Sequence, residues 1–90
     1  VLFSGDLGAS VAGDAENPVT DFKAHLPNML GFHKRYMCSN RILRYWVQMV
    51  REMEIDMIVP QHGAPFKGEE MINELLDWLW DLSCGVDFYI

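Results

Sequence analysis

Two segments of the sequence place a potential metal ligand directly after a short apolar run. Leu2-Phe3-Ser4-Gly5 is followed by Asp6, and Ile58-Val59-Pro60-Gln61 is followed by His62. The carboxylate of an aspartate can bridge two cations through its two oxygens, and neutral imidazole is a standard ligand for zinc or iron. We therefore predict that Asp6 and His62 are metal ligands, and we assign no catalytic residue.

Each motif also has an ordinary structural interpretation. An aspartate after glycine is commonly a turn residue, and the histidine of a Pro-x-His-Gly loop can simply bond to the backbone. The matching contexts favour the metal interpretation, because the two residues lie 56 positions apart, each after an apolar run. Strand ends in α/β folds are where ligand-binding groups gather, since the sheet holds them rigidly and the loops leave them accessible.

Two short apolar runs predict the strands that hold these residues. Residues 1–4 end at Gly5, and residues 55–59 end at Pro60. Residues 9–18, which follow the first strand, are mostly small and polar and predict an exposed loop.

Three helices are predicted between and after these strands. The first begins near residues 18–20 and is interrupted by Pro27 and Gly31, so it forms either two short helices or one kinked helix. The second follows the N-cap Ser39, and the third ends at Gly85 as its C′ residue. The apolar stripe of the second helix consists of Ile42, Leu43, Trp46, Val47, Val50 and Met53. The buried face of the third consists of Met71, Ile72, Leu75, Leu76, Leu79 and Leu82.

This order of strand, helices, strand and helix predicts an α/β fold in which helices cover a sheet. Half of the 90 residues are hydrophobic, and they include 3 Trp, 5 Phe and 6 Met. A domain of this size buries only about 60% of its unfolded surface and is marginal alone. We therefore expect part of this apolar surface to pack against a portion of the fold that is absent here. Val1 opens directly into an apolar run without a signal-peptide pattern, so we expect the chain to begin within a fold.

Composition also excludes several classes of partner. The net charge of −6 argues against a nucleic-acid backbone, which requires a basic face. No apolar run approaches the roughly 20 residues that span a bilayer, so no membrane partner is expected. Cys38 and Cys84 have neither CxxC spacing nor the density of a secreted disulfide scaffold. We interpret them as free thiols in a reducing cytoplasm, with a disulfide between them as the alternative.

Four segments resemble one family of proteins. Leu2-Phe3-Ser4-Gly5-Asp6 resembles the FSGD strand of metallo-β-lactamase-fold proteins, whose aspartate bridges two metals. Ile58-Val59-Pro60-Gln61-His62-Gly63 resembles the last P-x-H-G ligand loop of that fold. Residues 34–41 resemble the helix entry of the flavodiiron proteins and of their oxygen-binding, flavin-free relatives, and residues 81–87 resemble the tail of the flavin-free group. The resemblance implies the C-terminal portion of a metallo-β-lactamase αββα sandwich. Residues 1–90 then form a partial domain without its N-terminal half.

The resemblance also implies a function. It points to a non-haem di-iron domain that binds O2 for reduction or sensing, with Asp6 bridging two iron ions and His62 holding one of them. The His-x-Glu-x-Asp-His motif and one further histidine of the family lie upstream of that aspartate and are not present here. Two ligands are too few for a stable dinuclear site. We therefore expect the isolated chain to be inactive as an oxidoreductase and to require its missing half or a homo-oligomer as partner.

Two other functions fit parts of the sequence. A dinuclear zinc hydrolase of the same fold would bind two zinc ions and attack a small-molecule ester, amide or phosphodiester through metal-bound hydroxide. A protein-interaction module is suggested by Trp46, Trp78 and Trp80, although packing in the core explains these side chains better. His25 and His33 match no ligand position of the family, and we interpret both as surface or helix-packing residues.

Overall fold

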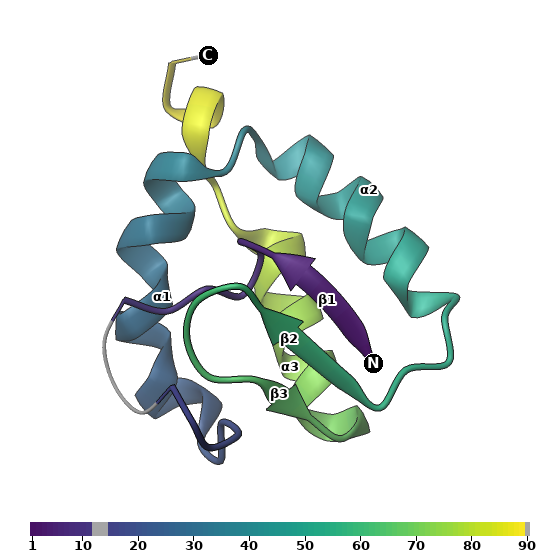
Figure 1. Ribbon diagram of the computed structural model, residues 1–90. Helices are drawn as coiled ribbons and strands as arrows, with labels where there is room; N and C mark the ends of the chain where they lie inside the picture. Colours follow the sequence, from purple (N-terminus) through teal and green to yellow (C-terminus); the bar gives the residue numbers. More distant parts are fainter. Residues whose placement is uncertain (12–14, 90) are drawn as a thin grey trace.

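A computed structural model describes residues 1–11 and 15–89 as a three-stranded sheet with helices packed against it (Figure 1). The elements in chain order are β1 (Leu2–Gly5), α1 (Phe22–Tyr36), α2 (Asn40–Arg51), β2 (Met57–Pro60), β3 (Phe66–Lys67), α3 (Glu69–Asp81) and the 3-10 helix η1 (Gly85–Tyr89). In Figure 1, α3 passes behind the sheet, and α1 and α2 flank it on either side. The predicted α/β fold is confirmed. Residues 12–14 of the predicted loop 9–18 lie outside the described residues.

β2 is the central strand of the sheet. β1 pairs with it in parallel, with Leu2 opposite Ile58 and Phe3 opposite Val59, and β3 pairs with its other edge in antiparallel fashion. A parallel pair needs a long crossover connection, and α1 and α2 supply it between β1 and β2. The carboxyl ends of β1 and β2 therefore meet at one edge of the sheet, and Gly5 is opposite Pro60 at that edge.

The two faces of the sheet differ sharply in exposure. Ile58 and Phe66, which are opposite each other on β2 and β3, are fully buried against the helices. Phe3 and Val59 point to the other face because side chains alternate along a strand. The side chain of Phe3 is 77% exposed there, and Val59 is half-buried. The sheet thus carries apolar residues on both faces, although helices cover only one of them.

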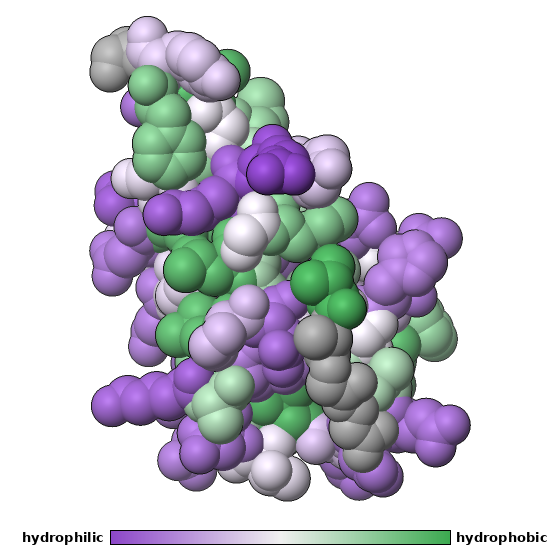
Figure 2. Space-filling model, turned by 90° about the vertical axis from the view of Figure 1, so that its left-hand side faces the viewer, coloured by the Kyte–Doolittle hydropathy of each residue, from purple (hydrophilic) through white to green (hydrophobic). Residues whose placement is uncertain are grey.

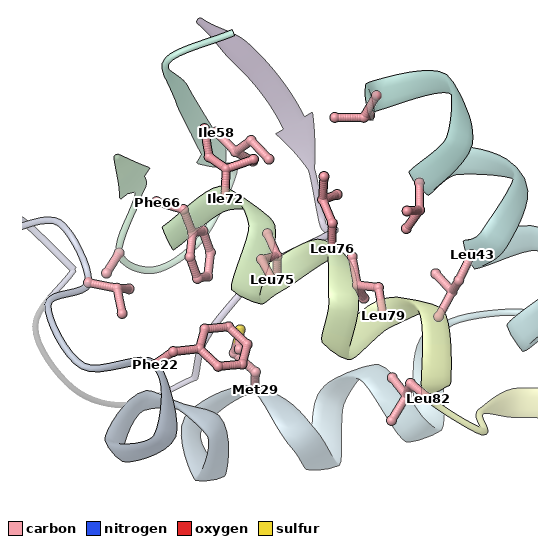
Figure 3. Packing of buried hydrophobic residues seen from close by; sticks show 14 of the residues in the cluster. Phe22, Met29, Leu43, Ile58, Phe66, Ile72, Leu75, Leu76, Leu79 and Leu82 are labelled. Carbon is pink, nitrogen blue, oxygen red and sulfur yellow. The ribbon is translucent and has the colours of Figure 1, made fainter. Parts of the chain in front are cut away.

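The hydrophobic core lies between the sheet and the helices (Figure 3). Its fully buried side chains include Met29, Val47, Val50, Ile58, Phe66, Leu75 and Leu79. α3 runs through the middle of this cluster, and the burial predicted for its face is confirmed except at Met71, which is half-buried. For α2 the predicted stripe is too wide, because Ile42 and Met53 are 55% and 42% exposed. α2 packs chiefly against α3, and contact with one neighbouring helix buries only the narrow row Leu43, Val47 and Val50.

α1 is one helix rather than two, and it begins at Phe22 instead of near residues 18–20. Asp21 is its N-cap, because its side chain accepts a hydrogen bond from the backbone N–H of Ala24. Pro27 lies inside the helix, where it cannot donate to the carbonyl of Lys23. Both residues are exposed, so water can bond this carbonyl and the helix continues.

α3 ends at Asp81 with Leu82 as its C-cap, so the predicted end at Gly85 is wrong. The reason is a side chain from another helix. The Nδ2 atom of Asn40 donates to the carbonyls of Leu79, Trp80 and Leu82 at 3.3, 2.9 and 2.7 Å. The Leu79 carbonyl also accepts from the N–H of Leu82, and the Trp80 carbonyl also accepts from Nε of Arg44. Asn40 thus adds a side-chain donor to the carbonyls at the end of the helix, where the sequence suggested a glycine-based cap.

The start of α2 also holds the chain after α3. The backbone N–H of Asn40 donates to the Asp87 carboxylate at 2.7 Å, and the same oxygen accepts from the N–H of Cys84 at 2.9 Å. Arg44 donates from Nε to the Trp80 carbonyl at 2.8 Å, and its guanidinium lies 4.7 Å from the centroid of the Trp80 ring. Polar contacts therefore join the start of α2, the end of α3 and the segment that contains η1.

Within residues 1–11 and 15–89, no helix combines the length and the apolar character needed to cross a membrane.

Replacing Asn40 with alanine should lower the free energy of unfolding by about 2 kcal/mol, because it removes a side-chain donor that the last carbonyls of α3 and the carbonyl of Leu82 share. Urea unfolding of the purified protein, followed by tryptophan fluorescence, measures this change. Asn73→Ala is the matched control, since Asn73 is exposed on α3, and it should shift the value by less than about 0.5 kcal/mol. Equal stability of Asn40→Ala and the wild type would contradict the capping role.

Candidate metal centre

The structure brings Asp6 and His62 to the same edge of the sheet. Asp6 directly follows β1, and His62 lies two residues after the end of β2. The backbone N–H of Gln61 donates to the carbonyl of Gly5. This hydrogen bond continues the contact between the β1 and β2 segments beyond the end of the strands. Neighbouring strands lie about 4.8 Å apart, so the loops that carry the two residues begin side by side. Both residues are exposed.

A buried serine joins these two loops. Ser10 donates from its backbone N–H to the carbonyl of His62 at 3.2 Å, and its Oγ accepts from the N–H of Ala64 at 3.4 Å. Ala9 and Ser10 are 2% and 7% exposed. The expectation that the whole stretch 9–18 is an exposed loop is therefore wrong at its start, because these residues pack against the His62 loop.

Gly63 makes this close approach possible. Its φ angle is +97°, a conformation that side-chain-bearing residues rarely adopt. A Cβ atom at this position would lie 2.0 Å from Oγ of Ser10 and 2.7 Å from its backbone nitrogen. The glycine that follows His62 in the sequence is thus needed for contact between the two loops, whatever His62 binds.

The Asp6 loop is a tight turn with internal hydrogen bonds. Oγ of Ser4 donates to the carbonyl of Leu7 at 2.7 Å, and the N–H of Ala9 donates to the carbonyl of Asp6 at 3.1 Å. The N–H of Gly8 points away from this turn and donates to Nε2 of His33 at 2.9 Å. A residue of α1 therefore contacts the loop that carries Asp6.

His33 is fully buried and neutral. Its Nδ1 lies 2.9 Å from the carbonyl of Met29 and must carry the ring proton, since Nε2 accepts from Gly8. Burial lowers the pKa of His33 below the ordinary value of a histidine, and the bond to Met29 and the charge of Asp6 oppose this only in part. The structure agrees with the interpretation of His33 as a helix-packing residue. No sequence pattern predicts its contact with Gly8, which is 25 positions away.

His25 lies on α1, outside the two segments that carry Asp6 and His62. Its ring packs edge-on against Phe66 with 5.7 Å between the ring centroids. Its Nε2 atom is buried and has no hydrogen-bond partner among the described residues. Desolvation lowers the pKa of His25. These features match a helix-packing role.

The donor atoms of Asp6 and His62 suit iron, which accepts both carboxylate and imidazole ligands, and zinc accepts them as well. In residues 1–11 and 15–89, however, no group of three or more His, Cys, Asp or Glu side chains is placed to hold a metal ion. The two residues therefore fit a metal centre as part of a ligand set that is completed from elsewhere. Their assignment as ligands remains a prediction.

Comparison with known proteins identifies relatives of the whole chain. A family model described as ODP family beta lactamase matches residues 1–63. A solved structure of the peroxy diiron species of the chemotaxis sensor ODP is 49% identical over 97% of this chain, with a TM-score of 0.90. A structure of the apo state of the chemotaxis sensor ODP from T. denticola is 50% identical over 97% of this chain, also with a TM-score of 0.90. A search of curated proteins found no match.

The chain spans 36% of the length of each of these two solved structures. Its fold matches the C-terminal part of a β-lactamase-like domain, as the resemblance of the four segments implied. Since the family model covers more than half of the residues, the chain belongs to the ODP family of beta lactamases.

Proposed function

We propose that this chain forms the C-terminal part of a non-haem di-iron domain that binds O2 for sensing. The observation that supports this most strongly is the similarity to the chemotaxis sensor ODP, at about half identity and across 97% of the chain. One of those structures is described as a peroxy diiron species. The shared region includes both loops of the sheet edge, so the Asp6 and His62 positions fall within the part that is similar.

In this proposal, Asp6 and His62 would hold the iron ions, with Asp6 as the bridging ligand and His62 as a ligand of one ion. Two ferrous ions, when bound, supply the redox chemistry that holds dioxygen. The sheet contributes rigidity, because Asp6 and His62 follow strands that are paired in parallel. Ser10 adds a fixed spacing between the loops through its bonds to His62 and Ala64. The backbones of the two loops are thereby held together at this end of the sheet.

The remaining ligands would come from an N-terminal half of the domain. Phe3 and Val59 form an apolar face on the side of the sheet opposite the helices, and in an αββα sandwich a second sheet covers such a face. β1 also has one edge without a partner strand among the described residues. A free edge and an exposed apolar face are the features expected where a sheet continues into another part of a fold.

The rival functions have less support. A dinuclear zinc hydrolase would use the same two residues, but the similar solved structures are described as a chemotaxis sensor, one of them with a peroxy diiron species, and not as hydrolases. Trp46, Trp78 and Trp80 are half-buried and pack against the core, as the core-packing interpretation expects. Figure 2 shows the α1 side as a mixture of hydrophilic and hydrophobic residues, which gives no support there to an interaction module. Reduction of O2 by an oxidoreductase uses the same centre and is the alternative within the di-iron proposal.

Cys38 and Cys84 support a reducing, cytoplasmic location in this proposal. Both are free thiols in the structure, and Cys38 is exposed. An exposed free thiol persists most readily where glutathione and thioredoxin keep it reduced.

The complete domain, purified anaerobically without added metal, should contain about two iron ions per chain and gain near-ultraviolet absorption on exposure to air. Replacing Asp6 and His62 together with alanine should abolish both signals, because a bridging ligand and a terminal ligand are lost. Elemental analysis for iron and zinc, followed by absorption spectroscopy, measures the outcome.

The matched control for this experiment combines Asp81→Ala with His25→Ala, which changes the same residue types outside the two loops that carry Asp6 and His62. It should retain the iron and its response to air. About two zinc ions per wild-type chain would favour the hydrolase, and unchanged iron in the Asp6 and His62 variant would refute the ligand assignment.

Residues 1–90 alone should bind ferrous iron weakly, since even a catalytic zinc site usually has three protein ligands. Anaerobic titration with ferrous iron should show no stoichiometric endpoint, and size-exclusion chromatography should show self-association through the free edge of β1. A monomer that binds two iron ions tightly would contradict the proposal of a partial ligand set.

A further inference from the structure

We propose that His33 is a positioning residue that holds the Asp6 loop in place and thereby raises the affinity of the centre for iron. This inference rests on the proposed function, because it requires Asp6 to be a ligand. The observation behind it is that a fully buried histidine of α1 makes one hydrogen bond to its own helix and one to the loop at the sheet edge.

The two hydrogen bonds run in sequence from the helix to the loop. Nδ1 of His33 donates to the carbonyl of Met29 at 2.9 Å, and Met29 is itself fully buried in the core. Nε2 then accepts from the backbone N–H of Gly8 at 2.9 Å. Gly8 is two residues after Asp6, in the same turn. The imidazole of His33 therefore links this turn to α1.

Packing leaves the ring little freedom to turn. The ring of Trp78 lies edge-on to it with 5.2 Å between the centroids and a 72° interplanar angle. Phe32 lies at 5.5 Å and 77°. A ring held on two sides, with opposite hydrogen-bonding roles at its two nitrogens, can serve only as one tautomer. The acceptor for Gly8 is thus fixed in direction as well as in position.

Removal of this acceptor would affect the loop specifically. Gly8 is buried, and no second acceptor for its N–H is found among the described residues. An unpaired buried N–H is costly, so the turn would move to bring this group to water. Such a movement would shift the carboxylate of Asp6, and residues that orient metal ligands typically contribute 10- to 100-fold to metal affinity.

The test compares three variants in the complete domain. His33→Leu keeps the apolar volume and removes both polar atoms. His33→Gln has an amide that can donate to Met29 and accept from Gly8. His25→Leu is the matched control, because His25 lies two turns earlier on α1 and its Nε2 has no hydrogen-bond partner in residues 1–11 and 15–89.

Iron affinity is measured by anaerobic competition with a chelator, and amide hydrogen exchange at Gly8 is measured in the metal-free protein. We expect His33→Leu to weaken iron binding about 10- to 100-fold and to speed exchange at Gly8 at least about tenfold, which corresponds to about 1.4 kcal/mol. His33→Gln should stay within about threefold of the wild type in both measurements, and His25→Leu should leave iron affinity unchanged. A role limited to core packing would instead make His33→Gln and His33→Leu equally defective, which would overturn the inference.

A second measurement needs no variant. Nitrogen-15 chemical shifts of the wild-type His33 ring should report the tautomer with its proton on Nδ1, and a proton on Nε2 would overturn the inference. Wild-type protein that binds no iron would overturn the proposed function together with this inference. Wild-type protein that binds iron, with unchanged affinity in His33→Leu, would overturn this inference alone.

Discussion

The parallel pairing of β1 with β2 is the contact on which the candidate centre depends. It brings two carboxyl ends to one edge of the sheet, so residues that are distant in sequence share one small region. Side chains alternate along a strand, so a shift of one residue in this pairing would move every side chain of β1 to the opposite face and displace the turn that carries Asp6. Ser10 and Gly63 secure the same register from outside the sheet, because Ser10 bonds to the His62 loop and a side chain at position 63 would push it away.

The helices contribute to the centre indirectly. α3 lies behind the sheet and fills the core, and α1 and α2 pack at its sides. His33 lies where this apolar layer meets the edge of the sheet, with Trp78 of α3 on one side of its ring and Gly8 at its Nε2 atom. The conformation of the exposed loop that carries Asp6 therefore depends on the packing of the core around His33. Such a link is the physical difference between a preorganised site and two ligands on flexible loops.

Much of the architecture could be predicted from the sequence, because α2, α3 and the two longer strands have clear apolar patterns. β3 has only two residues and is too short to show a period, and η1 is equally short. The burial of Ile42 and Met53 was predicted wrongly, since periodicity identifies the apolar face of a helix and not how much of it a neighbour covers. The end of α3 was missed because its cap is supplied by Asn40, about 40 positions earlier.

For the candidate centre too, sequence patterns predict the elements but not the tertiary contacts between them. The approach of Asp6 to His62 follows from general rules about strand ends, so their neighbourhood could be predicted. The contacts that hold their loops come from Ser10 and His33, whose types and spacings match no known pattern. Ser10 lies in a segment whose composition is typical of an exposed loop, and its burial results from a tertiary contact. Short-range sequence patterns do not contain such contacts.

The 56 positions between Asp6 and His62 also constrain when the centre can form in the cell. Ribosomes add about 5–20 residues per second, so roughly 3 to 11 s pass between the synthesis of one candidate ligand and the other. During that interval the nascent chain carries β1 without its partner strand. β1 can pair only after β2 has emerged, and the two loops are then brought together for the first time. The pair of loops that carries the two candidate ligands is therefore completed only late in the synthesis of this chain.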